Sequence, residues 1–427
     1  MANILILVQV FPPDNVATAQ LYGDLALDLS ALGNRVTVLS TTPHYSLDPD
    51  AKAWLPKASS FRFPFRTTNH AGIRVCRTWM PKKRRNTLYR IACWGSFHFA
   101  STLAGLMVRS RPDVILCPSP PPTIAISAYL LGKYHRIPFV YNAQELYPDV
   151  AINLGAVRNK FLIRGLCALE RFTYAKAAAI TVISQRMRLR ILEKGVPEGK
   201  VVLIPNFADT ESFRPLPRDN DFSRQQGLSD KFVVSYAGNM GKPQHLDVLL
   251  RAAARLKQEP QIQFLFIGDG AERATLLDLA KSLNLSNVCF LPYQSYSLMN
   301  EIYAASDVSY VPQAAGTSSD GVPSKVYRIM ACGRPVLAAT DPGSDLARMV
   351  ADSSGGTVVG ATSDEKVAEA IFSAFRNRGE WSSRGERARD YVTRNYSRSR
   401  ITRKYHDLLN QVADEKRKGR GQTSVVP

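Results

Sequence analysis

Two glycine-containing turns in the second half of the chain have the residue types that bind phosphate groups. One is Gly238-Asn239-Met240-Gly241-Lys242, and the other is Gly321-Val322-Pro323-Ser324-Lys325. Glycine lets the backbone approach an anion closely, and a helix that starts at such a turn presents unpaired N–H groups and the positive end of its dipole. Lys242 and Lys325 each add a positive charge. The turns therefore predict a diphosphate site, although an ordinary loop–helix–strand unit also explains the second turn.

Both turns lie between a predicted strand and a predicted helix. An apolar strand at Phe232–Ala237 leads into the first turn, and a helix at His245–Leu256 follows it. The second turn leads into a short helix from about Ser324 to Cys332, and a buried strand at Pro335–Thr340 comes next. In a parallel sheet such turns lie at the carboxyl ends of the strands, where α/β proteins bind ligands.

The first half of the chain begins with a comparable unit. Asn3–Val10 is a near-continuous apolar run, a helix with regularly spaced leucines follows, and Arg35–Thr41 is the next strand. This order is a βαβ unit, so the loop that contains Asn15 lies at a ligand-binding strand end. Residues 43–90, which include His44, have an irregular and basic pattern.

A carboxylate follows a later strand of the first half. The strand is Phe139–Asn142, and Glu145 comes directly after it. A carboxylate at a strand edge can bind a ligand hydroxyl, or it can simply cap the next segment.

Strands alternate with helices through both halves, which predicts two doubly wound α/β domains. Residues 206–230 are polar and contain prolines and a glycine, which is typical of a linker. The expected divisions are a first Rossmann-like domain (1–205), the linker (206–230), a second Rossmann-like domain (231–392), a last helix (393–414) and a basic tail (415–427).

The formal charge of +19 is unevenly distributed along the 427 residues. Residues 1–205 hold 26 Lys and Arg against 11 Asp and Glu, a charge of +15, and the remainder holds +4. A basic half indicates an anionic partner, and we favour a membrane surface because no nucleic-acid-binding motif is visible. A solvated basic face without a partner is the alternative. Six scattered cysteines without a CxxC pair, and an N-terminus with the pattern of a strand, indicate a cytoplasmic protein.

The run Ile91–Val108 is a mostly apolar helix whose length is the lower limit for crossing a bilayer. Polar residues within it favour a buried core helix or an interfacial helix over a spanning one. We expect residues 79–109, with the basic run Lys82-Lys83-Arg84-Arg85, to contact the cytoplasmic leaflet of the plasma membrane.

The stretch from Asp320 to Val336 resembles the nucleotide-sugar signature of retaining, GT-B-fold family 4 glycosyltransferases. The closest pattern is that of the subgroup for colanic acid, O-antigen and similar exopolysaccharides. Asp320 holds the family's first acidic position, and Met330-Ala331-Cys332-Gly333-Arg334-Pro335-Val336 fits the motif that follows. Arg328 stands where the family has a Glu that holds the ribose hydroxyls, and Arg cannot accept those hydrogen bonds.

Two further motifs carry the same resemblance. Glu145-Leu146-Tyr147-Pro148 is similar to the subgroup's acidic-Leu-Trp-Pro motif, in which the carboxylate orients a sugar hydroxyl or binds the acceptor. Gly268-Asp269-Gly270 is similar to the family's turn near the nucleotide base, although any strand-to-helix turn has this form.

The resemblance covers roughly residues 3–412 and implies the α/β GT-B fold. This fold has two Rossmann-like doubly wound domains that face a cleft, with a C-terminal helix that crosses back to the first domain. The implied activity is that of a retaining, metal-independent hexosyltransferase without a cofactor. Its implied substrates are a nucleoside diphosphate sugar, with UDP or GDP, and a lipid-linked or saccharide acceptor. No Asp-x-Asp motif lies at a convincing strand end, so no metal is expected.

The resemblance and the turns together assign candidate residues to three roles. The expected catalytic residues are Glu145 and Asp320. The expected donor-binding residues are Gly238, Asn239, Gly241, Lys242, Gly268, Asp269, Gly270, Gly321, Val322, Pro323, Ser324, Lys325 and Arg328. The expected acceptor-binding residues are Asn15, His44 and Tyr147.

Two other functions are compatible with the same residues. One is a nucleotide-sugar epimerase or hydrolase on the same two-domain plan. The other is a catalytically degenerate nucleotide-sugar-binding scaffold, which Arg328 at the usual Glu position favours.

Overall fold

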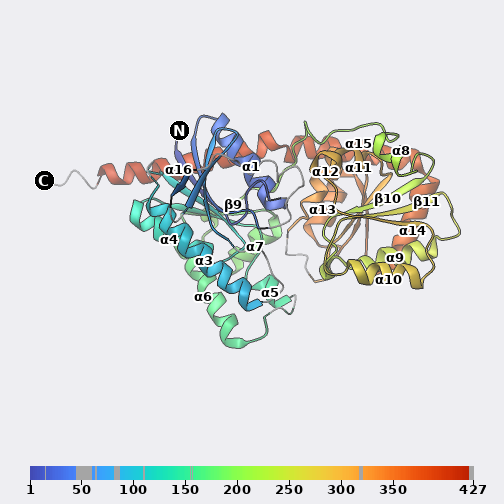
Figure 1. Cartoon of the computed structure of the whole chain (residues 1–427), viewed down its shortest axis with the longest axis horizontal. Helices are drawn as coiled ribbons and strands as arrows, with labels where there is room; N and C mark the ends of the chain where they lie inside the picture. Colours follow the sequence, from blue (N-terminus) through green and yellow to red (C-terminus); the bar gives the residue numbers. More distant parts are fainter. Residues whose placement is uncertain are drawn as a thin grey trace. The chain divides into compact units, whose positions relative to one another are not determined.

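The computed structural model describes residues 1–14, 16–44, 60–62, 65–80, 87–108, 111–153, 155, 157–316 and 321–422 of the chain. It divides into two compact units, Met1–Pro205 with Ser399–Pro427, and Asn206–Arg398. Each unit has a largely parallel sheet with helices on both faces (Figure 1). The predicted pair of doubly wound α/β domains is therefore confirmed.

The sheet of the first unit has the strand order β3-β4-β5-β2-β1-β6-β7-β8-β9. Its strands are β1 Asn3–Leu7, β2 Arg35–Thr41, β3 Ser60–Arg62, β4 Phe65–His70, β5 Ile73–Thr78, β6 Val114–Ser119, β7 Phe139–Ala143, β8 Ala179–Val182 and β9 Val201–Leu203. The strands from β5 to β9 in this order pair in parallel. The order reverses between β1 and β6, which is where such sheets bind ligands.

An antiparallel extension at the edge of this sheet corrects the expectation that residues 43–90 are irregular. The strands β3, β4 and β5 form a meander, and β5 pairs in parallel with β2. In β5, Ile73 is buried and Arg74 is exposed, whereas the rest of the strand, which includes Arg77, is buried.

Helices cover both faces of the first sheet (Figure 1). They are α1 Ala17–Ala31, α3 Thr87–Leu106, α4 Ile124–His135, α5 Asp149–Asn153, α6 Lys160–Lys176, α7 Gln185–Glu193 and α16 Arg398–Gln422. The apolar run at 91–108 lies mainly in α3, whose Cys93, Phe97, Ser101 and Ala104 are buried at helical spacing. Within the described part of the chain, no helix is both long enough and apolar enough to cross a membrane.

The second unit contains a parallel sheet with the order β12-β11-β10-β13-β14-β15. Its strands are β10 Phe232–Ala237, β11 Ile262–Ile267, β12 Val288–Leu291, β13 Val308–Pro312, β14 Val336–Ala339 and β15 Gly356–Val359. This is the strand order of a Rossmann domain, and it reverses between β10 and β13.

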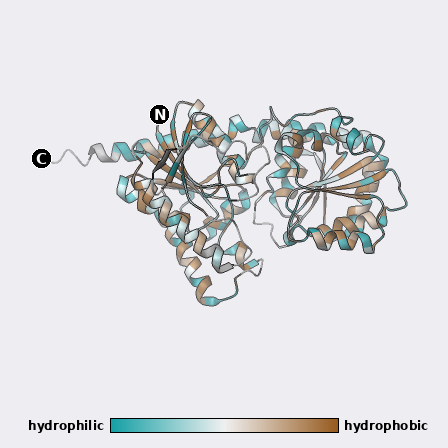
Figure 2. Cartoon of the chain, viewed as in Figure 1, coloured by the Kyte–Doolittle hydropathy of each residue, from teal (hydrophilic) through white to brown (hydrophobic). Residues whose placement is uncertain are grey.

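Both faces of the second sheet are apolar because both are covered. Val233 and Leu265 belong to the core on one face, whereas Val234 and Phe266 belong to the core on the other. Figure 2 shows these hydrophobic strands between the helical layers. The helices are α8 Asp221–Gln225, α9 Leu246–Arg255, α10 Arg273–Ser282, α11 Met299–Ala304, α12 Lys325–Ala331, α13 Asp345–Ser353, α14 Asp364–Arg376 and α15 Arg378–Tyr396.

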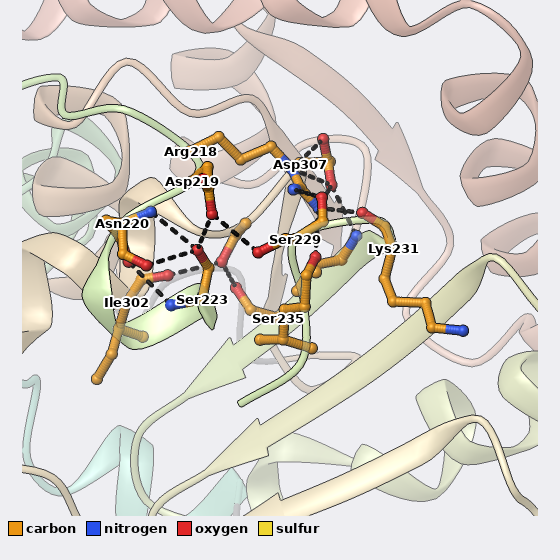
Figure 3. A network of polar contacts seen from close by, with 12 residues as sticks. Arg218, Asp219, Asn220, Ser223, Ser229, Lys231, Ser235, Ile302 and Asp307 are labelled. Atoms are coloured by element: carbon orange, nitrogen blue, oxygen red, sulfur yellow. Dashed lines mark hydrogen bonds and ion pairs between the residues drawn. The ribbon is translucent and has the colours of Figure 1, made fainter. Parts of the chain in front are cut away.

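A polar network holds the segment 217–231 against the second sheet (Figure 3). The Arg218 Nε lies 3.1 and 3.0 Å from the two carboxylate oxygens of Asp307, and its other nitrogens donate to the carbonyl oxygens of Leu228, Ser229 and Lys231. Asp307 also accepts a 2.7 Å hydrogen bond from the Val233 backbone N–H. One guanidinium thus joins the segment to the start of β13.

The last helix returns to the first unit, as predicted. The Tyr405 hydroxyl accepts a hydrogen bond from Asn142 of β7, and Arg417 forms an ion pair with Asp113 just before β6. Near the amino end of β2, Asn34 lies 2.8 Å from the His406 ring and 3.2 Å from the Asn410 amide.

Candidate functional site

Lys325 and the Gly238 turn meet where the strand order of the second sheet reverses. The turn follows β10, and the loop that leads to Lys325 follows the neighbouring strand β13. The Lys325 Nζ lies 3.8 Å from the centroid of the Tyr236 ring, and it would be 2.9 Å from a Cβ atom at position 238. Two segments about 90 residues apart, each predicted to bind phosphate, are therefore in contact.

The Lys325 ammonium is a half-buried positive charge. The face of the Tyr236 ring stabilises it, and no carboxylate among the described residues forms an ion pair with it. Burial lowers the pKa of Lys325 to about 7 because the charged form is poorly solvated. An anion in this position would stabilise the charged form and would be held strongly, because the surroundings screen the charge less than water does.

Two glycine turns pack backbone against backbone next to Lys325. A Cβ atom at Gly268 would lie 2.0 Å from the Gly238 carbonyl oxygen, and one at Gly270 would lie 2.3 Å from the Met240 carbonyl oxygen. Gly238 and Gly268 have φ values of +147° and +134°, which residues with side chains rarely adopt. The expected donor-site glycines 238, 268 and 270 are thus brought together by this close contact.

The backbone of the Gly238 turn is partly occupied by internal hydrogen bonds. The Gly238 N–H donates to the Ile267 carbonyl, the Met240 N–H to the Asp269 carbonyl and the Gly241 N–H to the Gln244 side chain. These groups were expected to bind a diphosphate. Because three of the four N–H groups from Gly238 to Gly241 already have protein acceptors, the ammonium of Lys325 carries more of the positive potential than expected.

The remaining expected site residues of the second unit lie near Lys325 and the Gly238 turn, except Asp320, an expected catalytic residue, which lies outside the described residues. Asn239, Lys242 and Asp269 are exposed, and Lys242 begins the short 3-10 helix that follows the turn. The turn from Gly321 to Ser324 precedes α12, which begins at Lys325 close to the predicted start.

Gln313 holds the start of that turn and was not identified from the sequence. Its Nε2 donates to the Gly321 carbonyl at 3.0 Å, and its Oε1 lies 2.9 Å from the Thr340 hydroxyl. Gln313 follows directly after β13, and a polar residue at the end of a strand is the sequence feature that could have identified it as a site residue. Tyr236 was also missed, because nothing in its own sequence neighbourhood indicates a contact with Lys325.

Arg328 packs among aromatic rings. Its guanidinium carbon lies 5.4 Å from the centroid of the Phe213 ring and 5.1 Å from that of the Tyr296 ring. The two rings contact each other edge to face at 5.6 Å. Arg328 therefore stabilises the packing of α12, which is one of the roles open to a cation on this helix.

In the first unit, His44 belongs to a buried charged cluster at the ends of β1 and β2. Its backbone N–H donates to Asp14 at 3.1 Å, and its Nδ1 lies 3.0 Å from the Thr41 hydroxyl and 3.9 Å from the Asp14 carboxylate. Arg77 is also buried and donates to the carbonyl oxygens of Pro12 and Thr41. Burial lowers the pKa of Arg77 to about 10, and nearby Asp14 opposes this shift. Asn15, which follows Asp14, lies outside the described residues.

Glu145 and Tyr147 lie together in the loop that follows β7. Burial raises the pKa of Glu145, and a hydrogen bond with Tyr147 partly offsets this increase. The Ser119 hydroxyl donates to the Glu145 carbonyl at 3.4 Å, so the loop is tied to the end of the neighbouring strand β6. A carboxyl group with a raised pKa at a strand end is a candidate for proton transfer or hydroxyl binding.

Comparisons with known proteins match both units. The family model described as "Glycosyl transferase 4-like domain" matches residues 18–206, and the model described as "Glycosyl transferases group 1" matches residues 218–394. The Escherichia coli K12 protein WcaI, named a colanic acid biosynthesis glycosyl transferase, is 26% identical over 406 residues, which is 92% of this chain and 96% of WcaI. WbjE of Pseudomonas aeruginosa, named a glycosyltransferase, is 29% identical over 56% of this chain and 60% of its own.

Solved structures share the fold. The sucrose-phosphate synthase of Thermosynechococcus elongatus has a TM-score of 0.74 at 20% identity, over 96% of this chain and 99% of its own. HepE of Anabaena in complex with UDP-glucose has a TM-score of 0.72 at 16% identity, over 96% of this chain and 100% of its own. With both units matched by glycosyltransferase models and 92% of the chain aligned with WcaI, this protein belongs to the GT-B glycosyltransferases, with a 4-like first domain and a group 1 second domain.

Proposed function

We propose that this enzyme transfers a sugar from a nucleoside diphosphate sugar to a lipid-linked or saccharide acceptor in the synthesis of a cell-surface polysaccharide or glycolipid. The Lys325 ammonium beside the Gly238 turn carries the proposal, because it is a half-buried cation at the ligand-binding edge of a Rossmann sheet. The named role of WcaI in colanic acid synthesis and the UDP-glucose complex of HepE support it. The nucleotide is UDP or GDP.

The main electrostatic task in this reaction is to stabilise the diphosphate that leaves the donor sugar. In the proposed mechanism the Lys325 ammonium binds the leaving diphosphate as its negative charge develops. The transfer retains the anomeric configuration, and the leaving phosphate accepts the proton of the acceptor hydroxyl. Glu145 binds the acceptor hydroxyl with Tyr147 as its neighbour, and Asp320 contacts the donor sugar. Neither carboxylate is required as a nucleophile in this scheme.

Isothermal titration of the protein with UDP-, GDP- and ADP-sugars tests the donor site directly. We expect the UDP-sugar or the GDP-sugar to bind, and its sugar to be transferred only when an acceptor is present. Rapid turnover of the donor alone would favour an epimerase or hydrolase. Binding without any transfer to lipid-linked or free saccharides would favour a scaffold, and absence of all nucleotide-sugar binding would contradict the proposal.

The affinity for the nucleotide sugar is expected to fall as the pH rises above about 7, the pKa of Lys325 in the free protein. The bound diphosphate stabilises the ammonium and so raises its pKa, which means that binding above this pH takes up a proton. The affinity then falls by up to about tenfold per pH unit, whereas below pH 7 it is constant with respect to this group.

Titration in two buffers of different ionisation enthalpy measures the proton uptake. A nucleotide sugar is a suitable probe because its diphosphate is esterified at both ends and does not titrate near neutral pH. A Lys325→Arg variant serves as the control, since Arg remains charged throughout and its affinity is expected to vary little with pH. Equal pH profiles for the two proteins would show that Lys325 does not bind the diphosphate.

We further propose that the enzyme associates with the cytoplasmic leaflet through the outer surfaces of α3, α4 and α6, which we call the basic apolar face. These helices are neighbours in the first unit (Figure 1), and the Tyr129 ring of α4 contacts the Phe172 ring of α6. The exposed apolar residues of this face are Phe99, Ile126, Leu130, Tyr134, Phe161 and Leu162. Its exposed cations are Lys133, Lys160, Arg164, Arg171 and Lys176.

The charge of this face fits an anionic lipid surface. The sequences of α3 and α4 contain no Asp or Glu, and the single acidic residue of α6, Glu170, forms a 2.6 Å ion pair with Lys194. Phe161, which is 79% exposed, lies beside Lys160 at the start of α6. Apolar and cationic side chains together bind the interface of an anionic bilayer. The basic run at 82–85, which was expected to take part, lies outside the described residues.

Replacing Lys160, Arg164 and Arg171 with alanine is expected to weaken binding to phosphatidylglycerol vesicles by roughly 100-fold, at about 1 kcal/mol for each charge. Replacing Arg376, Arg387 and Arg394 of the second unit changes the net charge equally and is the matched control. Sedimentation with anionic and with phosphatidylcholine vesicles measures the effect. The same loss in both triple variants would reveal attraction by net charge alone, and no loss in the α6 variant would exclude this face.

A further inference from the structure

We propose that Tyr405 of α16 is a positioning residue for the loop 144–148, and that it acts through the side chain of Asn142. The inference rests on the proposed function, which places Glu145 of this loop at the acceptor. It assigns a role in the reaction to the last helix of the chain, which contributes no residue to the candidate site described above.

The Asn142 amide makes four hydrogen bonds, which is its full capacity. Its oxygen accepts from the Tyr22 hydroxyl and from the Gln144 amide, each at 2.7 Å. Its nitrogen donates to the Thr181 hydroxyl at 2.8 Å and to the Tyr405 hydroxyl at 3.0 Å. Asn142, Tyr22 and Thr181 are fully buried, and Tyr405 is nearly so. The amide therefore has a single favourable orientation, determined by α1, β8, α16 and the loop itself.

This orientation determines where the loop begins. Gln144 donates to Asn142 and is the residue directly before Glu145. Leu146 on the other side of Glu145 is buried, and the Glu145 carbonyl accepts from Ser119. The Glu145 carboxyl is thus held between two anchored residues, and its own hydrogen bond is with Tyr147. A change in the position of Gln144 would be transmitted directly to the carboxyl group.

The Tyr405 hydroxyl can be removed with little effect on packing, because phenylalanine keeps the aromatic ring. Removing only this hydroxyl leaves one N–H group of Asn142 without a buried acceptor, which is unfavourable. The amide can then rotate to find another partner, and rotation removes its oxygen from Gln144. Burial raises the pKa of Tyr405, so the hydroxyl remains neutral and in place at all physiological pH values.

The same helix provides a matched control. Asn410 binds Asn34, which lies at the amino end of β2, whereas Asn142 lies near the carboxyl end of β7. Replacing Asn410 therefore weakens the docking of α16 at the opposite edge of the sheet. A loss that merely reflects looser docking of the helix would appear in both variants.

Tyr405→Phe and Asn410→Ala are to be compared in the full-length protein. For Tyr405→Phe we expect faster hydrogen exchange of the backbone amides of residues 143–149 and a roughly tenfold lower kcat/KM for the acceptor, with unchanged affinity for the nucleotide sugar. For Asn410→Ala we expect wild-type exchange in this loop and wild-type acceptor kinetics, even if its midpoint in urea is lower.

Unchanged exchange of residues 143–149 in Tyr405→Phe, or equal changes in both variants, would overturn the proposal. The exchange measurement needs no substrate, so it tests the positioning of the loop even if the wild-type protein transfers no sugar. Wild-type nucleotide-sugar titration separately tests the proposed function. A defect in Tyr405→Phe that affects exchange but not acceptor kinetics would show that the loop is held as described but does not serve the reaction, which also overturns the proposal.

Discussion

Replacing Lys325 with methionine is expected to weaken the binding of the nucleoside diphosphate sugar by roughly 100-fold, or about 2.7 kcal/mol. Methionine keeps much of the length and volume of lysine but has no charge. The ammonium lies beside the Gly238 turn, where three of the four backbone N–H groups from Gly238 to Gly241 already have protein acceptors. The charge is therefore a major attraction for the diphosphate, and titration below pH 7, where Lys325 is protonated, gives the full difference.

The loss is not expected to arise from unfolding. Because burial lowers the pKa of Lys325, the folded protein holds the ammonium less favourably than the unfolded chain does, and removing this charge does not reduce the free energy of unfolding. Lys281→Met on α10 applies the same substitution to an exposed lysine of the second unit and is expected to retain wild-type affinity. An affinity of Lys325→Met within about threefold of the wild type would contradict the donor site proposed here.

Replacing Arg218 with alanine is expected to lower the free energy of unfolding of the second unit by about 3 kcal/mol. The side chain of Arg218 binds the Asp307 carboxylate and three backbone carbonyl groups in a half-buried position (Figure 3). Its removal leaves these acceptors without their donor and leaves the Asp307 charge partly uncompensated. The segment 217–231 then loses its attachment to the start of β13.

Trp381 is the only tryptophan of residues 206–398, so its fluorescence in urea reports the second unit once the other three tryptophans are replaced by phenylalanine. Arg224→Ala is the matched control. Arg224 lies on the same segment and pairs with Asp219 and Asp221, but all three side chains are exposed, so we expect no measurable change in the free energy of unfolding. Equal effects of the two substitutions would contradict a specific role for Arg218.

The sequence was sufficient to predict the alternating architecture and the position of the glycine turns at the strand ends. Strands such as Phe232–Ala237 are apolar throughout because both faces of the sheet are covered, and the glycines at 238 and 268 come directly after strands. The close packing of the two turns requires glycine, because a side chain at 268 would overlap the backbone of residue 238. The sequence therefore carries a signal of this contact.

The β3–β5 meander was missed because its turn has an unusual sequence. Ala71 and Gly72 connect β4 to β5, and both have positive φ values, +47° and +92°. Such turns usually contain Asn-Gly or Asp-Gly, because alanine is strained at positive φ. Here Asn69 stabilises the turn from outside it by accepting a 2.7 Å hydrogen bond from the Gly72 N–H.

The contacts that orient the site residues depend on long-range packing and could not be read from the sequence. Tyr236 and Lys325 are about 90 residues apart, and Asn142 and Tyr405 are separated by 263 residues. The local sequence around an aromatic residue within a strand, or around an asparagine at its end, does not indicate which residue it will contact. The contact partners of Arg328 could not be predicted either, because its aromatic neighbours Phe213 and Tyr296 come from the segment before α8 and the segment before α11.

The position of α16 has a consequence for synthesis of the protein on the ribosome. Residues 1–205 emerge first, yet the hydroxyl group that completes the bonding of Asn142 is made only after the entire segment Asn206–Arg398. The continuous second unit can fold as it emerges, because it needs no later residues. The first unit is therefore the first to be synthesised but the last to be completed. A nascent chain released before residue 405 lacks part of its amino-terminal fold, even though it contains every strand of that fold.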